Sequence, residues 1–232
     1  MKKDITIVCI DTRDSERETA AATVAYCQQV FPCKEAILFT DKRLPVLPEL
    51  LSGISIISNI RSCNQDRGYD FFVLSQLVNY IQTSHYLIIQ TDGFILNPQA
   101  WDDHFLDYDY IGAPWAYSPL HDWFPHRPTG PNNSVGNGGF SLRSTKLGYI
   151  AQHIFCTSSR DPNFKTENWY PEDCFICRDI RPGLENKYEI KFAPEDIALK
   201  FSCENKPYTN QFGYHGSLTM QMNNIKKVVC QK

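Results

Sequence analysis

Residues 5–10 read ITIVCI, and Asp11 follows them directly. A continuous apolar run rich in β-branched residues is typical of a strand that is buried on both faces of a parallel sheet. Beyond it, Ala20, Val24 and Cys27 recur at helical spacing, which predicts an amphipathic helix. The chain therefore opens with a strand followed by a helix, the unit from which alternating α/β folds are built.

The same alternation continues through the first 90 residues. Further strands are predicted at 36–39, near 54–57 and at 85–90, with a helix over roughly 69–82. Strands that alternate with helices favour a Rossmann-like α/β fold with a mostly parallel central sheet, whose ligands gather at the carboxyl ends of the strands. Because we find neither an internal repeat nor an interdomain linker, residues 1–232 are predicted to form one domain.

Composition excludes some classes of protein and sets an expected location. The formal net charge is −3, which gives no support for nucleic-acid binding. No apolar run approaches the roughly 18 residues that span a bilayer, and no signal peptide is expected at the start of the chain. The nine cysteines are odd in number and scattered, and Cys174 and Cys177 lack a second pair at zinc spacing. We therefore expect a protein of the reducing cytoplasm.

Acidic residues follow three of the predicted strands, and one of them is Asp41 after the strand at 36–39. Asp11 comes after the first, and Gln90-Thr91-Asp92-Gly93 comes after the strand at 85–90. An aspartate at this edge is suited to Mg²⁺ or Mn²⁺, which need only one or two protein carboxylates when a diphosphate supplies other oxygens. Asp-Gly is also ordinary turn chemistry, so the segment by itself leaves both interpretations open.

A glycine-rich segment, Gly136-Asn137-Gly138-Gly139, precedes Phe140-Ser141-Leu142-Arg143. Glycines at Gly138 and Gly139 allow the backbone to approach a ligand closely, although such a segment is also compatible with a flexible turn. Arg143 is a candidate for binding a phosphate, or for pairing with a carboxylate. A helix is expected to begin near Ser144.

Aromatic residues accompany a further acidic pair. Trp169-Tyr170 precede Glu172-Asp173, and Trp115 opens a long proline- and aromatic-rich stretch over 115–138, which we interpret as a binding loop. Carboxylates at the start of a helix are ordinary dipole partners. The functional alternative is a general base beside an aromatic platform for sugar rings. A similar pair, Glu195-Asp196, has the same pattern, and spacing does not rank the two.

A histidine lies in the late segment Phe212-Gly213-Tyr214-His215-Gly216. Small neighbours would allow the ring to reach into a site, and neutral imidazole is a common metal ligand. Most isolated histidines are surface or hydrogen-bonded residues, so His215 alone indicates little.

The order of these segments resembles a known family. QTDGFILNPQAW, FLDYDYIGAPW, VGNGGFSLRS, PEDCF, ALKFSCEN and FGYHG follow one another between residues 69 and 216. They are similar to a bacterial family of uncharacterised glycosyltransferase-like domains found beside polysaccharide and lipopolysaccharide assembly enzymes. YDYIGAPW and GNGGFSLR are the most specific of them. More distantly, the layout resembles the metal-dependent β-1,4-galactosyltransferases, which implies a GT-A fold.

This resemblance implies roles for individual residues. Asp92 matches the last acid of the D-x-D motif, which touches the metal, and His215 matches a late histidine ligand. Gly138 and Gly139 match the segment that lines the sugar site. The pair Glu172-Asp173 matches the acids that hold the acceptor and act as base. Gln90 departs from the pattern, because it replaces the first acid of the motif.

The resulting hypothesis is an inverting glycosyltransferase that uses a nucleotide-diphosphate sugar, with a UDP-sugar as first choice, in polysaccharide or lipopolysaccharide synthesis. Asp11, Thr91, Asp92, Gly138, Gly139 and Arg143 would bind the donor, and Asp92 with His215 would hold Mn²⁺ or Mg²⁺. Asp173 or Glu172 would be the base, and Trp115, Trp169 and Tyr170 would stack on sugar rings. The acceptor would be a glycan or a lipid-linked glycan, and peripheral attachment to the inner face of the membrane is left open.

Two other classes are weighed against this hypothesis. A sugar nucleotidyltransferase would carry a glycine-rich basic loop after the first strand, whereas residues 11–15 contain no glycine. A non-catalytic carbohydrate-binding or assembly module would keep the aromatic residues but need neither Asp92 nor Asp173.

Overall fold

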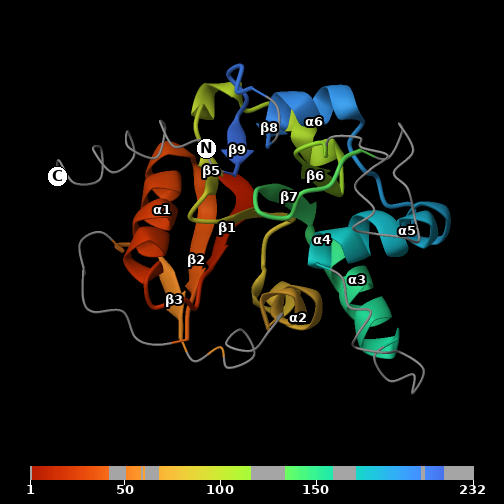
Figure 1. Ribbon diagram of the computed structural model, residues 1–232, viewed down its shortest axis with the longest axis horizontal. Helices are drawn as coiled ribbons and strands as arrows, with labels where there is room; N and C mark the ends of the chain where they lie inside the picture. Colours follow the sequence, from red (N-terminus) through yellow and green to blue (C-terminus); the bar gives the residue numbers. More distant parts are fainter. Residues whose placement is uncertain are drawn as a thin grey trace.

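A computed structural model describes residues 2–41, 51–58, 60, 68–115, 134–158, 171–204 and 207–216. Its larger sheet has the strand order β3-β2-β1-β4-β7-β6. The strands are β1 (Lys3–Ile10), β2 (Cys33–Phe39), β3 (Ser55–Ile57), β4 (His85–Ile89), β6 (Tyr110–Gly112) and β7 (Ser141–Ser144). The predicted strands β1 to β4 are mutually parallel, and β7 and β6 extend the sheet in antiparallel orientation (Figure 1). The predicted mostly parallel α/β fold is thus confirmed.

Alternate residues of β1 enter different cores, as the pleat of a strand requires. Ile5, Ile7 and Cys9 are fully buried in the core that α1 (Arg17–Val30) covers. Val8 and Ile10 face the other core, which α2 (Gly68–Ser75) and the 3₁₀ turn Leu77–Tyr80 cover. The central strands are therefore enclosed between helical layers, which explains why their sequences are continuously apolar.

A smaller sheet lies at one end of the larger one and consists of β5 (Gly93–Ile95), β9 (Gly213–His215) and β8 (Ser202–Cys203), in that order (Figure 1). β5 and β9 are antiparallel and place Gly93 opposite His215. β5 follows β4 through a tight turn, in which Gln90 and Gly93 bond reciprocally through their backbones. The small sheet therefore brings the late part of the chain to the carboxyl end of β4.

The remaining helices carry the second half of the chain. They are α3 (Thr145–Ser158), α4 (Glu172–Cys174), a π-helical turn (Phe175–Asp179), α5 (Arg181–Tyr188) and α6 (Glu195–Phe201), with 3₁₀ turns at Pro98–Ala100 and Asp103–Asp107. α3 begins where predicted, because Ser144 Oγ accepts a hydrogen bond from the backbone N–H of Leu147 at 3.0 Å. The helix predicted over 69–82 is interrupted at Gln76, where α2 gives way to the 3₁₀ turn.

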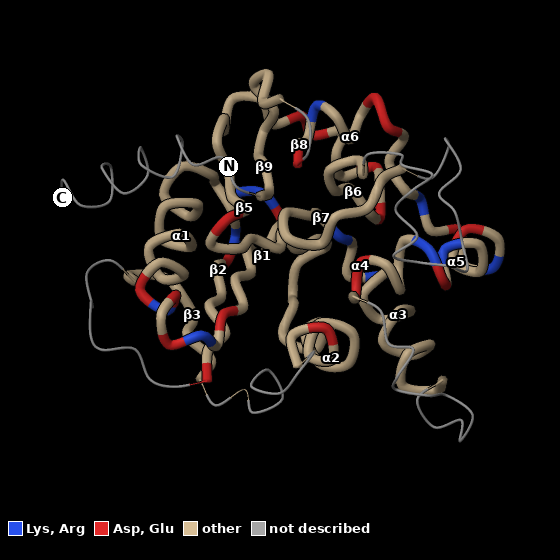
Figure 2. The backbone as a smooth tube through the Cα atoms, in the orientation of Figure 1, with Lys and Arg blue, Asp and Glu red and all other residues tan. Residues whose placement is uncertain are grey.

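Charged residues of both signs are interspersed over the described chain, and α5 carries both (Figure 2). No described helix is long and apolar enough to cross a membrane.

Candidate functional site at the carboxyl edge of the parallel strands

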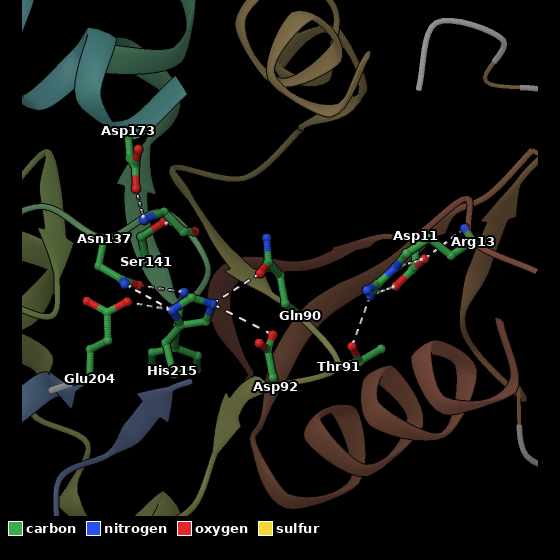
Figure 3. Close-up of polar contacts among 12 residues, drawn as sticks. Asp11, Arg13, Gln90, Thr91, Asp92, Asn137, Ser141, Asp173, Glu204 and His215 are labelled. Carbon is green, nitrogen blue, oxygen red and sulfur yellow. Dashed lines mark hydrogen bonds and ion pairs between the residues drawn. The ribbon is translucent and has the colours of Figure 1, made fainter. Parts of the chain in front are cut away.

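Asp92 and His215 meet beside the end of β4, although 122 intervening residues separate them in the sequence. Asp92 lies in the turn between β4 and β5, and His215 ends β9, opposite Gly93. His215 Nε2 lies 3.7 Å from Asp92 Oδ1, and the Asp92 carbonyl accepts a backbone hydrogen bond from Gly216 at 2.9 Å. The β5–β9 register therefore places the two predicted metal ligands next to each other (Figure 3).

Three further side chains surround the His215 ring. Nε2 lies 3.2 Å from Gln90 Oε1, while Nδ1 lies 3.2 Å from Glu204 Oε1 and 2.9 Å from the Asn137 amide nitrogen. When Nδ1 carries the proton and donates it to Glu204, Nε2 is left as the ligand atom, directed toward Gln90 and Asp92. In that tautomer the Asn137 amide nitrogen, itself a donor, makes no hydrogen bond with Nδ1. Glu204 and Asn137 were not singled out from the sequence. The quoted motifs contain both, but only the fold directs them at His215.

The electrostatics of this cluster favour a positive charge on or beside the ring. Burial by itself would lower the pKa of His215, but the Glu204 hydrogen bond and the charges of Asp92, Glu204 and Asp173 raise it overall. A cation that replaces the Nε2 proton would meet the same carboxylates.

The side chains around His215 can be compared with the ligands that a divalent cation requires. Within the described ranges, no group of three or more His, Cys, Asp or Glu side chains is gathered as a metal site. The Gln90 amide oxygen and one Asp92 carboxylate oxygen nevertheless lie 3.2 and 3.7 Å from His215 Nε2, which gives two oxygens and one nitrogen close together. This set fits Mg²⁺ or Mn²⁺ when a diphosphate completes the coordination, because these ions need few protein ligands.

The glycine-rich segment passes directly beside the His215 ring. A Cβ added to Gly139 would lie 2.1 Å from His215 Nε2, and one added to Gly138 would lie 2.1 Å from Glu172 Oε1. Asn137, with a φ of 60°, adopts the left-handed conformation between them and Gly136. Glycine is therefore required at both predicted positions by neighbouring side chains, and the segment lines the site.

Asp173 lies across this segment from His215 (Figure 3). Its Oδ2 accepts a hydrogen bond from the Gly138 N–H at 2.8 Å, and its Oδ1 accepts one from the Cys174 N–H at 2.7 Å. The carboxylate is only partly buried, so it is fixed by the backbone while remaining within reach of a ligand.

Glu172 points in a different direction from Asp173 and is buried. It forms a two-pronged ion pair with Arg143, with N–O distances of 2.7 and 2.9 Å and exposed side-chain fractions of 0% for Arg143 and 3% for Glu172. Burial raises the pKa of Glu172 to about 7 against the attraction of Arg143. The charged atoms of both side chains are therefore enclosed and paired with each other.

The predicted aromatic platform is only partly described. Trp115 is half-buried, with the Arg178 guanidinium 4.4 Å from its ring centre, and its ring fills the space beside Gly136. Trp169 and Tyr170, and most of the predicted 115–138 loop, lie outside the described residues.

Asp11 and Thr91 lie on the other side of the Asp92 backbone from His215 and contact Arg13 (Figure 3).

Cys174 and Cys177 are buried free thiols, and burial raises the pKa of each. A protonated, enclosed thiol is a poor nucleophile and metal ligand.

Solved structures with a similar fold are glycosyltransferases. LgtC, a galactosyltransferase solved with donor and acceptor sugar analogues, has a TM-score of 0.62 and 14% identity over 97% of this chain and 95% of that one. A glycosyltransferase involved in glycosylation of the major capsid of PBCV-1 has a TM-score of 0.50 and 12% identity over 98% and 99% of the two chains. The apo form of GlyE of Streptococcus pneumoniae has a TM-score of 0.51 and 12% identity, covering 100% of this chain and 62% of its own. The fold is therefore the GT-A fold of glycosyltransferases.

The chain belongs to the DUF5672 family, described as proteins of unknown function, whose model matches residues 58–215. No curated protein matches the sequence.

Proposed function

We propose that the protein is a glycosyltransferase that moves a sugar from a nucleotide-diphosphate donor, with a UDP-sugar as first candidate, to an acceptor hydroxyl. The observation that supports this most is the meeting of Asp92 and His215 at the carboxyl edge of the parallel strands, beside Gly138 and Asp173. In α/β sheets this edge is where ligands bind.

A divalent cation, Mn²⁺ or Mg²⁺, would be held by Asp92 and His215, with the Gln90 oxygen within reach. When bound, it would supply the positive charge that offsets the negative charge of the leaving diphosphate. Glu204 would orient His215 by accepting its Nδ1 proton.

Asp173 is the proposed general base for the acceptor hydroxyl. Two backbone N–H groups fix its carboxylate, which keeps it on one side of Gly138 while the donor site lies on the other. A base opposite the leaving group predicts a single displacement with inversion. The anomeric coupling constant of the product, measured by proton NMR, tests this stereochemistry.

The proposed acceptor is a glycan or a lipid-linked glycan of a polysaccharide or lipopolysaccharide pathway. With a lipid-linked acceptor, the protein would work peripherally at the cytoplasmic face of the membrane. Sedimentation with vesicles that contain such an acceptor, compared with plain vesicles, tests this placement.

The central experiment is a screen of nucleotide-sugar donors that measures nucleotide release with and without Mn²⁺. Asp92→Asn and Asp173→Asn should each lower turnover by at least about 100-fold while the fold is retained. Asp107→Asn is the matched control, because Asp107 is an exposed aspartate paired with His104. Full activity in both site variants would reject the roles proposed for Asp92 and Asp173, and a wild type that releases no nucleotide from any donor would reject the proposed activity.

Two further assays separate the competing classes. A sugar nucleotidyltransferase would release pyrophosphate from a sugar phosphate and a nucleoside triphosphate. A carbohydrate-binding module would bind no nucleotide in calorimetry, with or without Mn²⁺.

A further inference from the structure

Asp11 is covered by the side chain of Arg13. Arg13 Nε donates to Asp11 Oδ1 at 3.1 Å and Arg13 Nη2 donates to Asp11 Oδ2 at 2.6 Å, while the Arg13 backbone N–H donates to Oδ1 at 2.9 Å. The Asp11 side chain is only 5% exposed, whereas that of Arg13 is 63% exposed. A ligand that approaches this end of β1 therefore meets the guanidinium before it meets the carboxylate.

The guanidinium is also tied to the next strand. Arg13 Nη2 donates to Thr91 Oγ1 at 3.2 Å, and Thr91 directly precedes Asp92. Thr91 points toward Arg13, whereas Gln90 and Asp92 point toward His215 (Figure 3). Arg13 and the Asp92–His215 cluster thus lie at the same carboxyl edge of the sheet, on opposite sides of the backbone of residues 90–92.

This ion pair differs from an ordinary surface pair. In Lys34–Asp4, at the other end of β1 and β2, both side chains are exposed, at 59% and 52%. In Arg13–Asp11 the carboxylate is buried and fixes the guanidinium through two side-chain hydrogen bonds. Because the Arg13 side chain is already held in place, it loses little conformational entropy when it forms a further hydrogen bond. Among the described residues, Arg13 Nη1 has no hydrogen-bond acceptor, so the outward edge of the guanidinium keeps donors for a ligand.

We propose that Arg13, rather than Asp11, is the residue that contacts the nucleoside part of the donor, and that Asp11 and Thr91 position it. A diphosphate bound at Asp92 and His215 would extend along the rim and present nucleoside acceptors, such as the carbonyl oxygens of a uracil base, to the guanidinium. This inference rests on the proposed function, since it takes the diphosphate to lie at Asp92.

The test is calorimetric titration of the full chain with UDP and, separately, with pyrophosphate, both in the presence of Mn²⁺. Arg13→Gln should weaken UDP binding about tenfold or more, because a hydrogen bond from a charged group is lost. It should leave pyrophosphate binding unchanged, because pyrophosphate has no nucleoside. Lys34→Gln is the matched control and should change neither affinity, and thermal unfolding of each variant verifies that it is folded.

A second pair of variants separates contact from positioning. Asp11→Asn should also weaken UDP binding, but Asp11→Asn combined with Arg13→Gln should bind no more weakly than Arg13→Gln alone. Arg13→Lys keeps the charge but loses the fork, so its UDP affinity should fall between those of the wild type and Arg13→Gln.

The outcomes distinguish this inference from the proposed function. If the wild type binds neither UDP nor pyrophosphate, both fail. If the wild type binds UDP and Arg13→Gln binds it equally well, only the inference fails. If Arg13→Gln weakens the binding of UDP and of pyrophosphate equally, Arg13 is a phosphate ligand. If Asp11→Asn combined with Arg13→Gln binds UDP more weakly than Arg13→Gln alone, Asp11 is a direct contact. Either result overturns the inference about Arg13.

Discussion

At the scale of single residues, the buried ion pair Arg143–Glu172 connects two segments of the candidate site. Arg143 Nε also donates to Ser141 Oγ at 3.0 Å, and the Glu172 backbone N–H donates to Asp70 Oδ1 at 3.0 Å. Glu172 neighbours Asp173 in the chain, and Arg143 lies in β7 a few residues after the glycine-rich segment. The pair therefore links the glycine-rich segment, which contacts the His215 ring, to the start of α4, which contains Asp173.

Replacement of Glu172 by Leu should remove both carboxylate acceptors of the Arg143 guanidinium and leave its buried charge without a counter-ion. We expect a loss of about 3–5 kcal/mol in the free energy of unfolding, measured by urea denaturation. Glu172→Leu combined with Arg143→Met should recover part of this loss, because the uncompensated charge is then absent. A single Glu172→Leu variant as stable as the wild type would contradict this account of the pair.

Gly139 gives a second residue-scale prediction. In Gly139→Ala the new Cβ would collide with His215 Nε2, so the ring must turn away from Asp92. We expect Mn²⁺ affinity, measured by calorimetry, to fall about tenfold or more, as expected when the orientation of a ligand is lost.

Gly183→Ala is the matched control for Gly139→Ala. Gly183 lies in α5 with no other atom within 4 Å of an added Cβ, so Mn²⁺ binding should be unchanged. Wild-type Mn²⁺ affinity in Gly139→Ala would show that His215 is not a ligand.

At the scale of elements, β4 joins the two halves of the larger sheet, since it pairs in parallel with β1 and antiparallel with β7. His85 begins this strand, and its Nε2 lies 3.2 Å from the Tyr108 carbonyl oxygen, to which the protonated nitrogen donates. Burial lowers the pKa of His85 below its ordinary value of 6.5, in spite of that hydrogen bond. The folded protein therefore holds His85 in its neutral form.

The stability of the fold should consequently depend on pH through His85. As the pH falls below about 6.5, the unfolded chain gains a proton at His85 before the folded chain does, so the free energy of unfolding decreases. His215 and Glu172, whose pKa values are raised in the folded protein, act in the opposite direction, but equally in the wild type and in His85→Gln. Urea denaturation at pH 7.5 and pH 5 should therefore show that the free energy of unfolding of the wild type, relative to that of His85→Gln, decreases as the pH falls. The exposed His153 on α3 provides the control variant, His153→Gln. Identical pH dependence in His85→Gln and the wild type would refute the assignment.

At the scale of the whole molecule, the two sheets share one hydrophobic core. Phe212, which precedes β9, packs against Phe31 after α1, and also against Trp101 and Phe140, with ring centres 5.1–5.9 Å apart. The core that contains β1 residues such as Ile5 and Ile7 also contains Phe94 and Tyr214 of the small sheet. We therefore expect the small sheet to unfold together with the large one, as a single domain does.

Phe212→Ala tests this cooperativity. It should lower the free energy of unfolding by about 3–5 kcal/mol, with coincident transitions in tryptophan fluorescence and far-UV circular dichroism. Tyr149→Ala, at a residue 49% exposed on α3, should change stability by less than about 0.5 kcal/mol. Two separated transitions in the wild type would show that the sheets are independent units.

The alternation of buried strands and helices over the first 90 residues could be predicted from the sequence, because the periodicity of apolar side chains is a local property. The same holds for the start of α3 at Ser144 and for the placement of aspartates after strands. The sequence pattern did not show β7 and β6, whose antiparallel pairing depends on partners far away in the chain, nor the break in the helix at Gln76.

The sequence by itself thus determined the parallel strands, their carboxyl edge and the residue types available there. Only the tertiary structure decided which of those side chains face one another. The β5–β9 register directs His215 at Asp92, packing encloses Arg143 with Glu172, and the fork of Arg13 covers Asp11. The physical reason is that burial and ion pairing depend on distances across the fold, which separation along the chain does not specify.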